Sequence, residues 1–76
     1  MDEKRELLRA LPKIDEIVSH RAITECCAQY GRSLVVDTAR AVIDGLRQEI
    51  LAGGTPEVSM ESAIRRISVA ARRAAT

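Results

Sequence analysis

The residues best suited to chemistry are four arginines near the C-terminus, in the stretch IRRISVAARR. Arg65 and Arg72 are seven residues apart, as are Arg66 and Arg73, so on a helix they form two columns of positive charge. Glu61 lies one turn before Arg65, and no acidic residue follows it. Guanidinium groups without neighbouring carboxylates attract phosphates. Cations are also favoured at a helix C-terminus, which accounts for the second pair of arginines but not for the first. The pattern therefore favours contact with nucleic acid.

Arg40 and Arg47 form another pair one heptad apart, within a long predicted helix over residues 34–52. Asp37 and Asp44 alternate with them at spacings of three and four, which predicts a self-neutralising ladder worth roughly a few tenths of a kcal/mol per pair. Surface pairs of this kind usually mark a solvated face. Phosphate contact and a solvated face both stay open for this helix.

No arrangement typical of catalysis or metal binding is recognisable. His20 is the only histidine, and we expect it at the end of a short helix, where a partly charged ring interacts favourably with the helix dipole. Cys26 and Cys27 are adjacent and lack the CxxC spacing, so we expect two reduced, buried, apolar side chains. Gly53-Gly54 lacks the Lys-Ser/Thr of a phosphate-binding loop. We predict no catalytic, cofactor-binding or metal site in these residues.

The chain of 76 residues has room for one small domain with a marginal core. Residues 1–61 carry a net charge of −3 and residues 62–76 a net charge of +4, so the positive charge gathers at the C-terminal end. No apolar run approaches the ~18 residues of a membrane span, and no signal peptide is visible. We predict a cytoplasmic protein with no membrane partner.

Hydrophobic periodicity predicts an all-α fold, a small bundle of four to five helices with short links and a basic C-terminal helix. A first helix is expected over residues 1–11 and a second over 12–20, with Pro12 ending one and starting the next. A third, over 21–30, ends at Gly31, which allows the chain to leave the helix in a left-handed conformation.

The long helix over 34–52 has Ser33 as its candidate N-cap and Gly45 on its polar side. Its expected buried stripe consists of Val35, Ala39, Val42, Ile43, Leu46 and Ile50. Residues 53–59 form an internal linker, and Ser59 caps the last helix. The apolar stripe of that helix is Met60, Ile64, Ile67 and Ala71. We predict one domain over residues 1–76, in which the linker permits the last helix either to pack on the bundle or to extend from it.

Tyr30 is the only aromatic residue and directly precedes Gly31. We expect its ring to fill the corner between the third helix and the long one, because it supplies bulk that Ala and Val lack while its hydroxyl stays in water. Stacking on a nucleic-acid base is a less favoured alternative, since a single ring makes no stacking platform.

Two stretches, ALPKIDEIV (10–18) and YGRSLVVDTARAVIDGLRQEI (30–50), resemble the N-terminal segment of the bacterial selenocysteine synthases, the L-seryl-tRNA(Sec) selenium transferases. Members of that family open with Leu-Pro-x-(Ile/Val)-Asp, followed at a similar distance by Tyr-Gly and a helix with Val-Val and arginines. The corresponding residues here are Leu11, Pro12, Ile14, Asp15, Tyr30, Gly31, Val35, Val36, Arg40 and Arg47. The resemblance covers residues 7–52 well; beyond the Gly53-Gly54 turn only the basic helical character persists.

The resemblance implies a part of a larger enzyme. Full-length members are pyridoxal-phosphate-dependent transferases that form large ring-shaped homo-oligomers. They convert seryl-tRNA(Sec) to selenocysteyl-tRNA(Sec) through a dehydroalanyl intermediate, with selenophosphate as selenium donor. Their N-terminal domain grips the tRNA around its D-arm side, while the cofactor lysine and the active site lie downstream. We therefore expect this chain alone to be monomeric, non-catalytic and without cofactor.

On this view the partners are tRNA(Sec) and the catalytic domain of the same chain, and the domain engages RNA by charge and shape. Candidate RNA contacts are Arg32, Arg40, Arg47, Arg65, Arg66, Arg72 and Arg73, with Lys13 and Arg21 secondary. The main alternative is a helical docking or assembly module with no RNA affinity. A helix-turn-helix DNA binder is less favoured, because Asp37 and Asp44 would repel the phosphates of a major groove.

Overall fold

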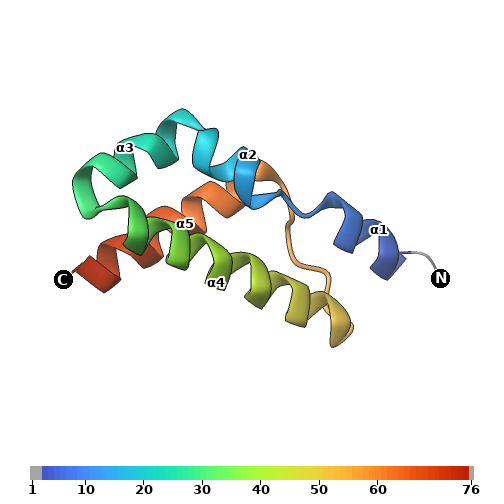
Figure 1. Ribbon diagram of the computed structural model, residues 1–76. Helices are drawn as coiled ribbons and strands as arrows, with labels where there is room; N and C mark the ends of the chain where they lie inside the picture. The colour runs from blue at the N-terminus through green and yellow to red at the C-terminus, as the bar shows by residue number, and fades with distance from the viewer. Residues whose placement is uncertain (1–2, 76) are drawn as a thin grey trace.

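The computed structural model describes residues 3–75, which form five helices (Figure 1). The helices are α1 (Glu3–Ala10), α2 (Ile14–Ser19), α3 (Arg21–Tyr30), α4 (Arg32–Leu51) and α5 (Met60–Ala75). No strand occurs in the described residues, so the predicted all-α bundle of four to five helices is confirmed. The first two positions of the predicted first helix, and Thr76, lie outside the described residues.

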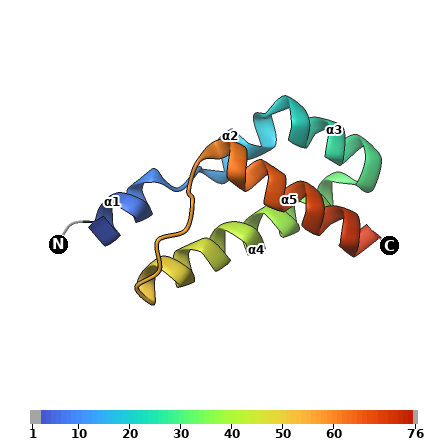
Figure 2. The same ribbon diagram turned by 180° about the vertical axis from the view of Figure 1, so that it is seen from behind.

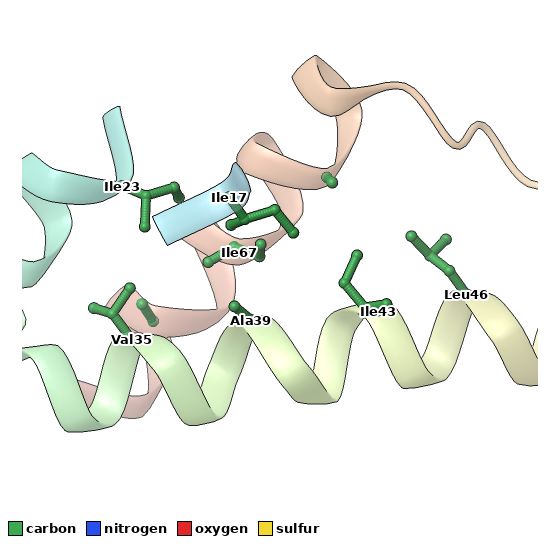
Figure 3. Packing of buried hydrophobic residues seen from close by; sticks show 9 residues of the cluster. Ile17, Ile23, Val35, Ala39, Ile43, Leu46 and Ile67 are labelled. Carbon is green, nitrogen blue, oxygen red and sulfur yellow. The ribbon is translucent and has the colours of Figure 1, made fainter. Parts of the chain in front are cut away.

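A long stripe on α4 organises the core, because α4 packs against each of the other four helices. Its buried residues are Val35, Ala39, Ile43, Leu46 and Ile50, as predicted, with Val42 half-buried beside them. Figure 3 shows Ile17 of α2, Ile23 of α3 and Ile67 of α5 gathered over this stripe. Interlocking aliphatic side chains thus fill a core that contains no Phe or Trp.

Helix α5 packs on the bundle rather than extending from it. Ala63, Ile67 and Ala71 are fully buried, and Met60 and Ile64 of the predicted stripe pack against the core. The helix runs alongside α4 in the opposite direction and also contacts α3 (Figure 2). Its N-cap is Ser59, as predicted: the Ser59 hydroxyl accepts a hydrogen bond from the backbone N–H of Ser62 at 3.1 Å.

The joint between α3 and α4 is a single residue, Gly31. The φ of Gly31 is +97°, a value that residues with a side chain rarely adopt. This conformation turns the chain from α3 into α4 with no further linking residue. The carbonyl of Gly31 accepts the N–H of Val35 at 3.2 Å, so α4 begins at Arg32. The prediction of Ser33 as N-cap was wrong, because the glycine already starts the helix two residues earlier. Tyr30 is half-buried against the core at this corner, as expected.

The joints around α2 differ from the sequence-based expectation. Lys13 is extended and is the N-cap of α2, so the buried Pro12 precedes the helix instead of opening it. His20 ends α2 and caps the start of α3, where its Nδ1 accepts the N–H of Ala22 at 3.1 Å. The side chain of His20 thereby supplies an acceptor to a backbone N–H in the first turn of α3. The favourable contact with a helix C-terminus expected for His20 is therefore replaced by a cap at an N-terminus.

Two further features shape the outside of the molecule. Helix α1 has no buried residue and projects from the bundle at the end opposite the C-terminal end of α5 (Figure 1). Both cysteines are reduced and half-buried, and Cys26 Sγ lies 3.6 Å from Ser68 Oγ, joining α3 to α5. Among the described helices none combines the length and the apolar character that crossing a membrane requires.

Replacing Ile17 by alanine should lower the free energy of unfolding by about 2–5 kcal/mol, the usual cost of emptying a buried isoleucine site. Ile17 is 0% exposed and is the one buried residue of α2, so its loss loosens α2 from α4. Urea denaturation followed by circular dichroism measures the change. Leu51→Ala is the matched control, since Leu51 is 48% exposed and should cost little. Equal effects of the two substitutions would contradict this account of the core.

The substitution of glycine by alanine should have opposite signs at two positions. Gly31→Ala should destabilise the domain by about 1–3 kcal/mol, because its positive φ strains any side chain. Gly45→Ala should stabilise it by about 1 kcal/mol, because Gly45 is helical and an added Cβ meets no atom within 4 Å. Thermal and urea unfolding of both variants test the pair, and a stabilising Gly31→Ala would show that the corner is not held by this conformation.

Candidate functional site

The structure places five of the seven predicted arginines on two surfaces formed around α4. The first surface, called here the α4–α5 groove, has a volume of about 720 Å³. It is lined by Ala41, Val42, Gly45, Leu46 and Glu49 of α4 and by Arg65, Arg66, Val69, Ala70 and Arg73 of α5. Three of the seven predicted arginines thus meet along one side of a groove that the sequence did not predict.

The floor of the α4–α5 groove is apolar because small residues occupy the neighbouring faces of both helices. Ala41 and Gly45 are exposed and follow each other at a spacing of four, one face round from the buried stripe of α4. On α5 the floor is formed by Ala70 and Val69, and Val69 is 49% exposed. The small side chains of α4 leave the α4–α5 groove open between the two helices, and the arginines along one side of the groove come from α5.

The second surface, called here the elbow patch, surrounds the bend between α1 and α2. Its cations are Arg9 of α1, Lys13 of the link, and Arg40 and Arg47 of α4. Arg47 lines a hollow with Arg9 and Lys13 over apolar side chains, and it lines a neighbouring hollow with Arg40 and Asp44. Residues separated by more than thirty positions in the sequence therefore form one positive region.

The other predicted contacts lie apart from these two surfaces. Arg32 is the first residue of α4 at the Gly31 corner, and Arg72 is exposed in the last turn of α5. Arg21 lies on α3, where its guanidinium is 3.8 Å from the carboxylate of Glu25. Sequence reasoning missed Arg9, because its distance from Arg47 along the chain gives no periodic signal; only its place on the polar side of a short amphipathic helix hinted at exposure.

Charge pairing is weak at Arg65 of the groove and at Arg40 and Arg47 of the elbow patch. Arg65 lies 3.7 Å from Glu61, but the two side chains are 73% and 87% exposed, so water and salt screen the pair. The ladder expected on α4 does not form: within residues 3–75 no ion pair joins Arg40 or Arg47 to Asp37 or Asp44. The reason is that exposed pairs gain little against the freedom of the side chains. The guanidinium groups of α4 consequently face solvent.

The chemical feature that these two surfaces share is positive charge beside apolar side chains. In the described part of the chain, no group of three or more His, Cys, Asp or Glu side chains is placed to hold a metal ion. No polar or charged side chain is buried there either, so no such group is held in the low-dielectric setting that usually tunes a catalytic acid or base. Positive charge beside exposed apolar area suits an anionic partner.

Comparison with known proteins identifies the relatives of this chain. The family described as "Selenocysteine synthase N terminal" matches residues 8–47, which is more than half of the chain. An L-seryl-tRNA(Sec) selenium transferase of Clostridium botulinum (strain Loch Maree / Type A3) is 39% identical over 62 residues, covering 82% of this chain and 13% of the relative. No solved structure shows a significant match.

Two further relatives have the same name. The L-seryl-tRNA(Sec) selenium transferase of Rhizobium meliloti (strain 1021) is 36% identical over 47 residues, covering 62% of this chain and 10% of the relative. That of Haemophilus ducreyi is 40% identical over 47 residues, with the same coverage. The chain thus spans 13% or less of the length of these relatives. The resemblance noted in the sequence is confirmed, and the chain belongs to the family of selenocysteine synthase N-terminal domains.

Proposed function

We propose that this chain is the tRNA-recognition domain of a selenium transferase. It binds tRNA(Sec) and positions seryl-tRNA(Sec) for conversion to selenocysteyl-tRNA(Sec) by a catalytic domain in the same protein. The observation that carries the proposal is the gathering of arginines on two surfaces beside α4, in a chain of this family. The names of the relatives supply the substrate, because each is described as acting on a seryl-tRNA(Sec).

The two surfaces suit a folded RNA. Such an RNA presents phosphates and overall shape more than readable base edges, so a helical domain engages it by charge and contour. The seven arginines predicted from the sequence remain the proposed contacts: Arg40 and Arg47 in the elbow patch, Arg65, Arg66 and Arg73 in the α4–α5 groove, and Arg32 and Arg72 at the helix ends. Arg9 and Lys13 join the elbow patch. A helix with its side chains is about 10–12 Å wide. The two surfaces beside α4 can therefore contact two separate stretches of the RNA backbone.

The described residues offer no site that fits pyridoxal phosphate, the cofactor expected for the proposed reaction. Pyridoxal phosphate needs a lysine for its Schiff base and enclosed polar partners for its ring and phosphate. The two lysines of the chain are exposed: Lys4 Nζ donates to the Leu51 carbonyl at 3.3 Å, and Lys13 caps α2. Within residues 3–75 no buried polar side chain lies near either of them. We propose that the cofactor and the catalysis belong to the catalytic domain, while this chain supplies binding and orientation.

A docking or assembly module is the second candidate. The exposed Val69 in the groove and the exposed Leu51 at the end of α4 favour it, since partner proteins cover apolar surface of this kind. Oligomerisation that depends on concentration, without affinity for RNA, would distinguish this candidate from the first. The monomeric state of the isolated chain, the ring-shaped assembly of the whole enzyme and the cytoplasmic location stay predictions.

A titration followed by NMR tests the proposed function. The ¹⁵N-labelled chain is mixed with unmodified tRNA(Sec), and with tRNA(Ser) as control, at two salt concentrations. We expect saturable shifts that are stronger with tRNA(Sec) and centred on α4 and α5, and an affinity that falls as salt rises because phosphate contacts release counterions. Equal chemical-shift changes with both RNAs that disappear at the higher salt concentration would reject specific recognition of tRNA(Sec). The docking module would then be the favoured function.

Charge-removing variants assign the binding to its surfaces. Arg65→Gln with Arg66→Gln in the groove, and Arg40→Gln with Arg47→Gln in the elbow patch, should each weaken tRNA(Sec) binding and lower the salt slope by about one per lost phosphate contact. Arg5→Gln is the matched control, because Arg5 is exposed on α1 and lines neither surface. If Arg5→Gln weakens binding as much as the paired variants do, the arginines act only through net charge.

A further inference from the structure

The α4–α5 groove contains more than a phosphate track requires. Cations alone are sufficient to follow an RNA backbone. The groove instead places an exposed apolar floor, including the 49% exposed Val69, directly beside its arginines. Burying such a floor is favourable only for a partner that brings apolar area together with negative charge.

A single carboxylate in the groove narrows the choice of partner. Glu49 is the only acidic residue of its lining, among three arginines. It would repel a phosphate, and it would equally repel the carboxylates of an acidic protein helix laid into the groove. A carboxylate does accept hydrogen bonds from the exocyclic amino groups of nucleobases. The combination therefore matches a base better than a bare backbone or an acidic peptide.

The order of the arginines fits a strand that crosses the floor. Figure 2 shows that α5 runs opposite to α4. The order of residues along two such helices therefore places Arg65 and Arg66, early in α5, nearer the Glu49 end of the lining than Arg73. Seven residues of helix separate Arg66 from Arg73, which is about 10 Å along the axis. Phosphates on both sides of an inserted nucleotide can thus each meet a guanidinium. A second copy of this groove is disfavoured as occupant, because three arginines would face three arginines.

We propose that the α4–α5 groove holds an unpaired nucleotide from a loop of the bound RNA. The base lies on the floor formed by Val42, Gly45, Val69 and Ala70, and Glu49 accepts a hydrogen bond from one of its amino groups. Arg65, Arg66 and Arg73 hold the flanking phosphates and offer guanidinium planes for stacking, as in other single-stranded RNA sites. The inference rests on the proposed function and adds the kind of RNA element that is recognised.

Filling the groove without changing its charge tests the inference. The probes are a fluorescein-labelled RNA stem–loop with unpaired loop nucleotides and a blunt RNA duplex with the same number of phosphates. Gly45→Leu places a side chain into open space on the floor, since a Cβ there meets no atom within 4 Å. We expect about tenfold weaker binding of the stem–loop, the size of effect typical of one stacked base, and an unchanged affinity for the duplex.

The matched control is Gln48→Leu, because Gln48 is exposed on the same helix and lines neither surface. Thermal melting checks that both variants fold. If Gly45→Leu does not, Ala41→Leu replaces it, since the exposed Ala41 lines the same floor. Equal stem–loop affinities of the groove variant and the control would overturn the inference.

Removal of Glu49 changes the RNA affinity in opposite directions for a site that contacts only phosphates and for a site that holds a base. Glu49→Ala takes away a negative charge, so it strengthens binding of both probes if the groove is only a phosphate track. If Glu49 accepts a hydrogen bond from a base, the same change weakens stem–loop binding selectively. Strengthening of both probes would therefore overturn the inference.

The same experiments keep this inference separate from the proposed function. Selective binding of tRNA(Sec) by the unaltered chain, together with insensitivity to Gly45→Leu, would reject the nucleotide site and keep the recognition domain. A lack of any RNA binding by the unaltered chain would reject both.

Discussion

The packing of one apolar stripe on α4 is the constraint on which the rest of the structure depends. Val35, Ala39, Ile43, Leu46 and Ile50 are buried along its length, and α4 contacts all four other helices. A domain this small gains little from any further core, so its stability is concentrated at this stripe. The short helices α2 and α3 each contribute a single fully buried isoleucine to it, and α1 contributes none. Their positions are therefore set by where α4 offers space.

The same constraint creates the surfaces that carry the proposed function. A helix that buries one stripe leaves the rest of its circumference for other contacts, and residues seven apart stay on one face. Arg40 and Arg47 remain beside the elbow of α1 and α2 for this reason. On the other edge, Ala41 and Gly45 are too small to fill the space against α5, so a groove opens there. Both surfaces place cations beside apolar side chains, and the groove adds the exposed Val69.

Under the proposed function this domain contributes the position of the substrate, and the chemistry belongs to another domain. Holding a large substrate so that its reactive end reaches a distant catalytic group lowers the entropic barrier of the reaction. Such holding does not require buried acids or bases, and the described residues bury no polar side chain. It does require a rigid support for the contact residues, which α4 and α5 provide through their shared core. The proposed division of labour between a binding domain and a catalytic domain rests on these properties.

The sequence by itself determined the helices, their buried faces and the turn at Gly31, because these depend on contacts between residues three or four apart and on backbone preferences at single positions. The cap at Ser59 and the corner position of Tyr30 were predictable for the same reason. The family could also be identified from ordered motifs within residues 7–52.

Only the tertiary structure decided which surfaces the arginines share. The meeting of Arg9 with Arg47, the packing of α5 on α4 and the groove between them join residues that are far apart in the chain. Two helix boundaries differ from the expectation for local reasons: His20 caps α3 through the N–H of Ala22, and α4 starts at Arg32 because Gly31 precedes it. Periodicity identifies which face of a helix is buried, but it does not say which helix covers that face. The packing of the other four helices on α4 therefore determines which arginines share a surface.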